Sequence, residues 1–148
     1  MNIRPLEPRD VPAWTALRIA LWADADAADL ATEAAGQFSG RPVAPIVFVC
    51  EETSGRVVGM IEADIRSTAE GCLTSPVPYI EGWYVLPDAR TLGVGRALVE
   101  AVEHWARERG YAEIASDALI DNEVSRSAHG ALGYEETARI VCFRKSLS

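Results

Sequence analysis

The most constraining feature of the sequence is a strand, a glycine-containing turn and an amphipathic helix that follow one another directly. Residues 79–85 are largely apolar, which predicts a strand that stops at Pro87. From Val94 to Trp105 apolar residues recur at helical spacing, and Gly110 ends the predicted helix. Such a turn directs free backbone N–H groups and the positive helix end to one point. The segment is therefore a candidate anion-binding site, although a tight turn without a ligand would have the same pattern.

The other segments predict an α/β fold with one central sheet. In chain order, we expect a helix from Asp10 to about Trp22, a loop with a short helix within 23–36, a hairpin of strands at 46–50 and 56–61, a strand at 112–116, a helix at 122–132 and a last strand at 137–145. This order predicts a mixed, mostly antiparallel twisted sheet with helices on both faces. The chain has 148 residues and no Gly/Ser-rich linker, so we expect a single domain over residues 1–148.

Charge restricts the class of partner. The sequence carries 22 acidic and 14 basic side chains, a formal net charge of −8. A field of this sign repels phosphate backbones and anionic lipid surfaces, whereas it attracts cations. We therefore expect neither nucleic acid nor a membrane as a partner, and we expect a polycationic small-molecule substrate.

Cysteine usage and the N-terminus bear on the compartment. Cys50, Cys72 and Cys142 are odd in number and far apart, so neither a disulfide framework nor a metal site is predicted. The N-terminus lacks the apolar segment of a signal peptide, and the longest apolar stretch, at 43–50, is far too short to cross a bilayer. We expect a protein of the reducing cytoplasm that needs no metal.

The glycine turn distinguishes between known phosphate-binding motifs. A dinucleotide fingerprint would need a third glycine at Leu98, and a P-loop would need a Gly-Lys-Ser/Thr sequence that is missing. The segment instead matches, as Arg90-x-x-Gly93-x-Gly95, the R/Q-x-x-G-x-G/A signature of the GCN5-related N-acetyltransferases (GNAT), which it resembles. This resemblance implies the GNAT fold and a turn that holds the pyrophosphate of acetyl-coenzyme A. The residues expected to contact acetyl-CoA are Trp83, Val85, Arg90, Leu92, Gly93, Val94, Gly95, Arg96, Asn122 and His129.

Several further stretches resemble one branch of that family, the bacterial aminoglycoside 6′-N-acetyltransferases. They are Ile19–Trp22, Ser75–Val77, Glu81–Pro87, Ala115–Asp117 and His129–Thr137. The resemblance implies transfer of acetyl from acetyl-CoA to the 6′-amine of an aminoglycoside by direct attack in a ternary complex, an activity that confers antibiotic resistance. Because similar enzymes are often dimers, it also implies a homodimer.

Two departures from the family pattern affect the expected chemistry. Many members carry a Tyr as general acid on the helix that corresponds to 122–132, and His129 occupies the matching place. Some relatives have an aromatic residue in the loop where this chain has Thr68, Ala69 and Glu70. Two other functions remain open, an acetyltransferase for polyamines or protein N-termini and a non-catalytic acyl-CoA-binding sensor. The sensor would need neither of two carboxylates, Glu81 and Asp117.

Acetyl transfer needs a neutral amine, a polarised carbonyl and a place for the leaving thiolate. Glu81 interrupts an apolar strand, so its carboxylate must face a cleft or a partner such as an Arg. We expect it to bind the ammonium or to accept its proton. Asp117 follows a strand at the end where open sheets place ligands, although capping a turn is an alternative. The resemblance places Asp117 beside the accepting amine, where we expect it to position the substrate or to act as the base. It also implies an oxyanion-binding N–H near Val85.

The remaining candidates are less specific. Trp22 either stacks on a sugar ring or belongs to the core at the end of its helix. Asn122 either contacts the coenzyme or caps a helix, and His129 is a candidate for the thiol end of the donor site. The expected acceptor residues are Trp22, Asp24, Glu70, Glu81 and Asp117.

Overall fold

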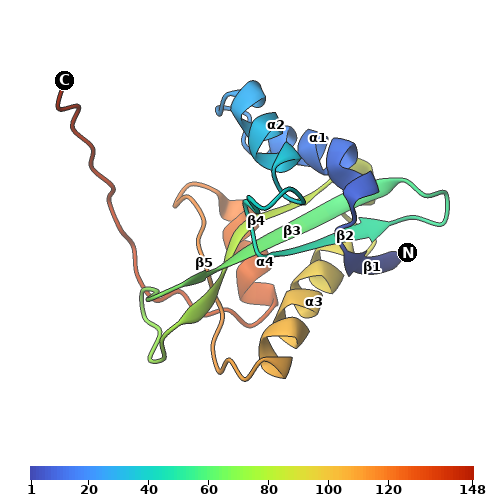
Figure 1. Ribbon diagram of the computed structural model, residues 1–148. Helices are drawn as coiled ribbons and strands as arrows, with labels where there is room; N and C mark the ends of the chain where they lie inside the picture. The colour runs from blue at the N-terminus through green and yellow to red at the C-terminus, as the bar shows by residue number, and fades with distance from the viewer.

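A single five-stranded sheet organises the computed structural model, which describes residues 1–148 (Figure 1). The strands lie in sequence order and are β1 (Asn2–Pro5), β2 (Ile46–Glu51), β3 (Val57–Arg66), β4 (Val77–Val85) and β5 (Ala115–Ser116). The first four pair antiparallel, and β5 runs parallel to β4. The predicted mixed, mostly antiparallel sheet is therefore confirmed.

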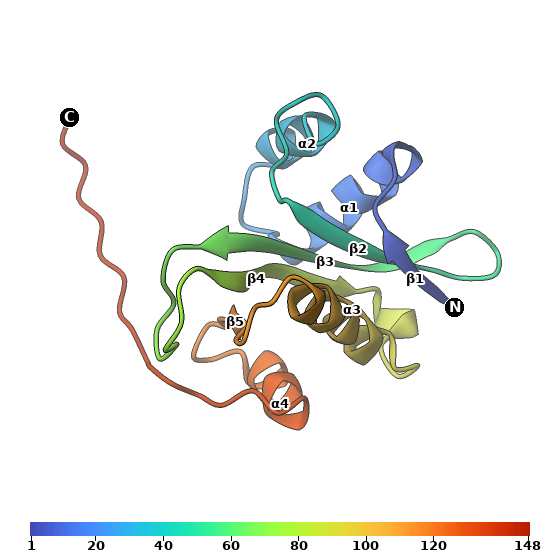
Figure 2. The same cartoon turned by 60° about the horizontal axis from the view of Figure 1, so that its bottom comes forward.

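Helices cover both faces of this sheet, as predicted. Figure 2 shows α1 (Val11–Leu21) and α2 (Ala27–Ala35) on one face, and α3 (Val94–Glu108) and α4 (Glu123–Ala131) on the other. Short 3₁₀ turns precede α1 and follow β4, at Pro8–Asp10 and Pro87–Ala89. None of the helices combines the length and the apolarity that a membrane span requires.

The core consists of two apolar clusters, one on each face of the sheet. On the α3 face, Leu98 and Val102 of the predicted helical stripe pack with Val58 and Ile61 of β3. On the α1 face the cluster includes Trp14, Leu17, Val49 and Met60. In β2 the residues alternate between the clusters, with Ile46 and Cys50 on the α3 face and Val47 and Val49 on the α1 face, so side-chain direction can be followed along the strand.

A β-bulge in β4 interrupts this alternation at Glu81. Glu62 of β3 pairs with Gly82, whereas the next residue, Ala63, pairs with Ile80, so Glu81 is the extra residue. Ile80 packs in the α3 cluster, and alternation turns Glu81 to the α1 face. A bulge re-aims side chains at the place where it occurs. It thus allows the polar side chain of Glu81 to leave an otherwise buried strand on the face of α1.

Two expectations for the ends of the chain are wrong. The last strand predicted at 137–145 is absent. Thr137 still contacts Glu70, and the residues after it extend away from the body, which Figure 1 shows in red. The preceding strand contains only Ala115 and Ser116, rather than 112–116. It is therefore too short to form many backbone hydrogen bonds with a further strand. Asp10 precedes α1 but caps no N–H of that helix, because its carboxylate pairs with Arg4 and accepts the Glu7 N–H.

Candidate active site

The carboxyl half of β4 borders an opening in the sheet. Strand β5 pairs with β4 only at Tyr79 and Ile80, so β4 continues to Val85 without a neighbour on that side. The Leu86 N–H donates to β3, and antiparallel alternation directs the peptide groups of Val85 away from β3. The Val85 carbonyl accepts the Arg90 Nε at 2.8 Å. The expected oxyanion-binding N–H thus belongs to a strand segment that is open on one side.

The glycine turn lies next to this opening and carries unpaired backbone donors. Gly93 has a φ of 78° and precedes α3 as its N-cap. The N–H groups of Gly93, Val94, Gly95 and Arg96 donate to no backbone carbonyl. The buried indole N–H of Trp83, beside Gly95, also has no partner. These donors at the positive end of α3 fit the phosphates and polar atoms of acetyl-CoA.

The two glycines of the turn have different roles in the fold. A Cβ at Gly95 would lie 3.1 Å from Cζ2 of Trp83, whereas a Cβ at Gly93 would meet nothing within 4 Å. Gly95 therefore makes room for the Trp83 ring, and Gly93 is the glycine with space for a ligand. Contact of Gly95 with acetyl-CoA stays a prediction. Of the other turn residues, Val94 has its side chain in the core, while Leu92 is exposed.

Replacing Gly93 with Ala is expected to weaken acetyl-CoA binding about tenfold, because its Cβ stands in the space beside the free N–H groups and one charge-assisted hydrogen bond is lost. Gly110→Ala is the matched control: Gly110 has a φ of 82°, also has nothing within 4 Å of its Cβ position and follows the other end of α3. Titration calorimetry of both variants separates backbone strain from ligand exclusion. Equal affinities in the two variants would contradict an anion site at Gly93.

On the α1 face, a chain of contacts joins the two predicted catalytic carboxylates. Arg66 donates from Nε and Nη2 to both carboxylate oxygens of Glu81, at 2.8 and 2.7 Å. Its guanidinium lies 3.5 Å from the ring centroid of Tyr79, and the Tyr79 hydroxyl donates to Asp117 at 2.9 Å. The alternative of an Arg partner for Glu81 is thus realised, though in a half-exposed place. Burial, with the Asp117 carboxylate as a second cause, raises the pKa of Tyr79 well above its usual range.

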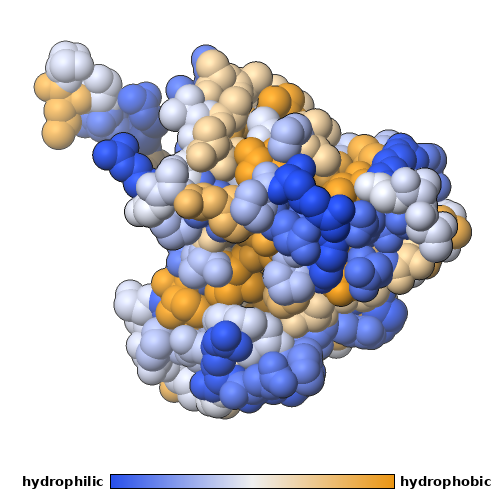
Figure 3. Space-filling model, turned by 45° about the vertical axis from the view of Figure 1, so that its right-hand side comes forward, coloured by the Kyte–Doolittle hydropathy of each residue, from blue (hydrophilic) through white to orange (hydrophobic).

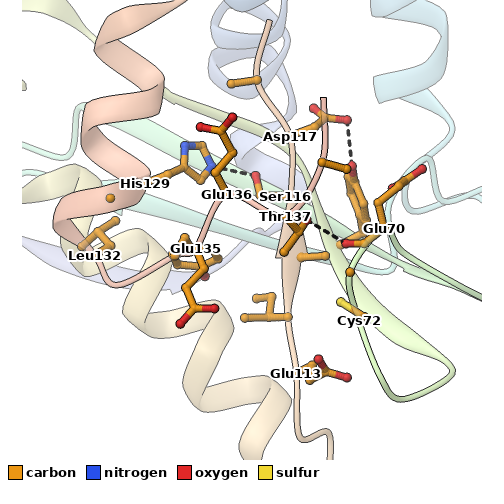
Figure 4. Close-up of a pocket in the computed structure, with 18 of the residues that line it drawn as sticks. Glu70, Cys72, Glu113, Ser116, Asp117, His129, Leu132, Glu135, Glu136 and Thr137 are labelled. Atoms are coloured by element: carbon orange, nitrogen blue, oxygen red, sulfur yellow. Dashed lines mark hydrogen bonds between the residues drawn. The ribbon is translucent and has the colours of Figure 1, made fainter. Parts of the chain in front are cut away.

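The other three expected acceptor residues, Trp22, Glu70 and Asp24, differ in their position relative to the contacts that link Glu81 with Asp117. The Trp22 ring covers Gly82, where a Cβ would approach Trp22 within 2.8 Å, so Trp22 packs on the strand directly beside Glu81. Glu70 lines a hollow of about 1220 Å³ together with Asp117 (Figure 4). Asp24 is exposed in the turn after α1 and contacts none of the other candidates.

His129 lines the same hollow and has both ring nitrogens engaged (Figure 4). Nδ1 is 2.7 Å from the Ser125 carbonyl, so it carries a proton, and Nε2 lies 2.8 Å from the Ser116 hydroxyl. The ring meets Trp83 and Tyr134 edge-on. His129 held in this way is fixed in place beside the open half of β4.

Asn122 caps α4, because its Oδ1 accepts the Ser125 N–H at 3.1 Å, so the capping alternative is realised. Its contact with the coenzyme stays a prediction. The residues that sequence reasoning missed are Arg66, Tyr79 and Ser116. None of these residue types indicates a site by itself, and only the pairing of β3, β4 and β5 brings them to Glu81, Asp117 and His129.

Comparisons with known proteins agree with this geometry. Residues 11–134 match the model of the Acetyltransferase (GNAT) family. Aminoglycoside N(6′)-acetyltransferase type 1 of Klebsiella aerogenes is 44% identical over 98% of this chain and 96% of its own, and that of Stenotrophomonas maltophilia is 40% identical over 99% and 94%. The predicted acetyl-CoA-dependent N-acetyltransferase agrees with this family and these relatives.

Solved structures give the same result. The 6′-N-acetyltransferase AAC(6′)-IG from Acinetobacter haemolyticus has a TM-score of 0.88 and 34% identity, with both chains covered fully. AAC(6′)-Iy in complex with the bisubstrate analogue CoA-S-monomethyl-acetylneamine has a TM-score of 0.86 and 32% identity, over 98% of this chain and 97% of the other. The predicted GNAT fold is thus confirmed, and the chain belongs to the GNAT acetyltransferase family.

Proposed function

We propose that this protein transfers acetyl from acetyl-CoA to the 6′-amine of an aminoglycoside and thereby confers resistance. One observation carries the proposal: the open half of β4 lies between unpaired N–H donors at the start of α3 and two linked carboxylates, Glu81 and Asp117. An anionic donor and a cationic acceptor would thus approach the same strand from opposite sides. The names of the relatives and the net charge of −8 support the same substrate.

The proposed reaction joins the neutral amine nitrogen to the acetyl carbonyl carbon and breaks the carbon–sulfur bond. Glu81 takes the ammonium proton, Asp117 orients the amine, and the Val85 N–H stabilises the oxyanion. As the amide forms, the nitrogen gives up a second proton and the leaving thiolate takes up one, so CoA departs as the thiol. The sulfur leaves at the side of His129, whose Nε2 lies 2.8 Å from the Ser116 hydroxyl. The proposal places this reaction in the cytoplasm, where Cys50, Cys72 and Cys142 stay free. The single domain over residues 1–148 remains a prediction.

Release of CoA thiol tests the function against its alternatives. Kanamycin, spermidine and a short peptide with a free N-terminus are each offered with acetyl-CoA. Only kanamycin is expected to release CoA thiol, at a rate that saturates as the kanamycin concentration rises. Mass spectrometry and NMR of the product then locate the acetyl group on the 6′-nitrogen. Turnover of spermidine or of the peptide alone would favour the alternative acetyltransferases, and no turnover with tight acetyl-CoA binding would favour the sensor.

We further propose that the protein is a homodimer in which residues 137–148 of each copy pack on the other. These residues stand apart from the body in Figure 3 and expose Ile140, Val141, Phe143 and Leu147. Each body offers the unpaired outer edge of β5 and the hollow beside it, whose lining includes the apolar residues Ile114, Leu119 and Leu132. Exposed apolar side chains next to an unpaired strand edge favour association with another chain.

Truncation after Glu136 tests the dimer. Light scattering coupled to gel filtration is expected to give a dimer for the full chain and a monomer for the truncated one. A full chain that is monomeric would contradict the proposal. If truncation of that monomer also lowers Tm, the segment folds back on its own β5 edge.

A further inference from the structure

Arg66 already occupies the carboxylate that is expected to receive the substrate amine. It is the last residue of β3, and its guanidinium forms two parallel hydrogen bonds with Glu81. Both side chains remain accessible, with 42% of Arg66 and 31% of Glu81 exposed. A cationic group therefore sits on Glu81 at the surface, where another cation can reach it.

The surroundings of Arg66 provide a second position for its charge. The guanidinium stacks on Tyr79, whose hydroxyl leads to Asp117, and the nearby Asp117 carboxylate adds to the negative field around Arg66. A guanidinium that leaves Glu81 therefore keeps an aromatic face and a nearby anion without crossing the protein. This makes exchange between two cations at Glu81 a local movement of one side chain.

A comparison with another ion pair on the same face shows that this pair is the exchangeable one. Arg18 also binds a β3 carboxylate, Glu62, through two short hydrogen bonds, but both of these side chains are only 3% exposed. Water screens a half-exposed pair, so breaking it costs little free energy, whereas breaking a buried pair costs several times more. Of the two, only the Arg66 pair is weak enough to open for a ligand.

We propose that Arg66 is a built-in competitor of the substrate: it holds Glu81 in the free enzyme, the substrate ammonium displaces it, and it returns once the amine has become an amide. This inference rests on the proposed function. The product amide carries no positive charge, so it cannot compete with a guanidinium for Glu81. Arg66 therefore determines substrate affinity and favours product release through the same exchange.

Calorimetric titration of kanamycin into Arg66→Met tests the competition. Removing the competitor is expected to lower the Kd of kanamycin about fivefold, the value of a half-exposed ion pair with a cation–π contact. Inhibition by 6′-N-acetylkanamycin is expected to become stronger by a similar factor. Arg56→Met is the matched control, because Arg56 makes an equally paired, exposed contact with Asp88 and its loss changes the net charge by the same amount.

A double-mutant cycle with Glu81→Gln assigns the effect to the pair. In the Glu81→Gln background, Arg66→Met is expected to leave the kanamycin Kd unchanged, because the contested carboxylate is gone. An Arg66→Met variant that retains the Tm of the wild type and binds kanamycin equally or more weakly would overturn the inference. An equal gain in Arg56→Met would also overturn it. A wild-type protein that acetylates no aminoglycoside would instead contradict the proposed function.

Discussion

Glu81→Gln is expected to lower the kcat for kanamycin acetylation by about 10²–10⁴-fold, the range that general-base assistance supplies in typical enzymes. Asp117→Asn, by contrast, is expected mainly to raise the KM for kanamycin, because a group that orients the amine acts on binding. Both substitutions keep an oxygen that accepts a hydrogen bond, from Arg66 at position 81 and from Tyr79 at position 117. The fold and the contact chain between the two sites are thus retained.

The decisive measurement is kcat against pH for the wild type and for Glu81→Gln. If Glu81 is the base, the acidic limb of the wild-type profile disappears in the variant. An identical acidic limb in both profiles would reassign the base to Asp117 or to bulk water. Asp88→Asn is a suitable control, since Asp88 is an exposed carboxylate that pairs only with Arg56. Its profile should match that of the wild type.

The need of Glu81 for a cleft or a partner was predictable from sequence, but the identity of its surroundings was not. A carboxylate inside an apolar strand must find a cleft or a partner, which is a local argument. The direction of its side chain depends on the bulge in the β3–β4 register, and Arg66 reaches it through that same pairing. Register between strands is set by packing across the whole sheet, so it does not follow from the residues around position 81.

In the glycine turn and in the C-terminal segment, too, the sequence predicts the local feature, whereas contacts between distant elements decide the rest. The spacing from Arg90 to Gly95 was sufficient to predict an anion site before a helix, and the free N–H groups agree with it. The sequence does not show that Gly95 faces Trp83, since that contact joins a helix to a strand. The apolar, partly β-branched run at 140–143 is typical of a strand, yet a strand also needs a neighbour. The two residues of β5 provide little edge within one copy.

The buried pair of Arg18 and Glu62 is expected to give the largest stability effect. Arg18→Met should lower the free energy of unfolding by about 3–5 kcal/mol at neutral pH, because it leaves a carboxylate buried without its cation. Glu62 is 2% exposed and would retain only the Trp14 indole N–H as a partner. Urea unfolding followed by tryptophan fluorescence measures this loss. Arg4→Met, which breaks a less buried pair with Asp10, serves as the comparison.

The pH dependence of this loss identifies its cause. Burial raises the pKa of Glu62 from its usual value of 4.5, and the Arg18 charge opposes that shift. Without Arg18 the folded-state pKa rises further, so near neutral pH the folded variant must either take up a proton or retain a buried charge. Folding then binds protons, and stability falls as the pH rises above 4.5. The difference in free energy of unfolding between variant and wild type is therefore expected to narrow as the pH is lowered toward 4.5. A difference that is independent of pH would indicate lost packing.

Arg18 also links this pair to the acceptor side of the site. Its guanidinium lies 4.9 Å from the Trp22 ring, and Trp22 covers the strand beside Glu81. A second contact, from Arg18 to Glu33 at 2.6 Å, ties α2 to the same point. Arg18→Met is therefore expected to raise the KM for kanamycin at a pH where the variant is still folded, while the Kd of acetyl-CoA stays unchanged. An equal loss of affinity for both substrates would instead mean that the whole sheet has loosened.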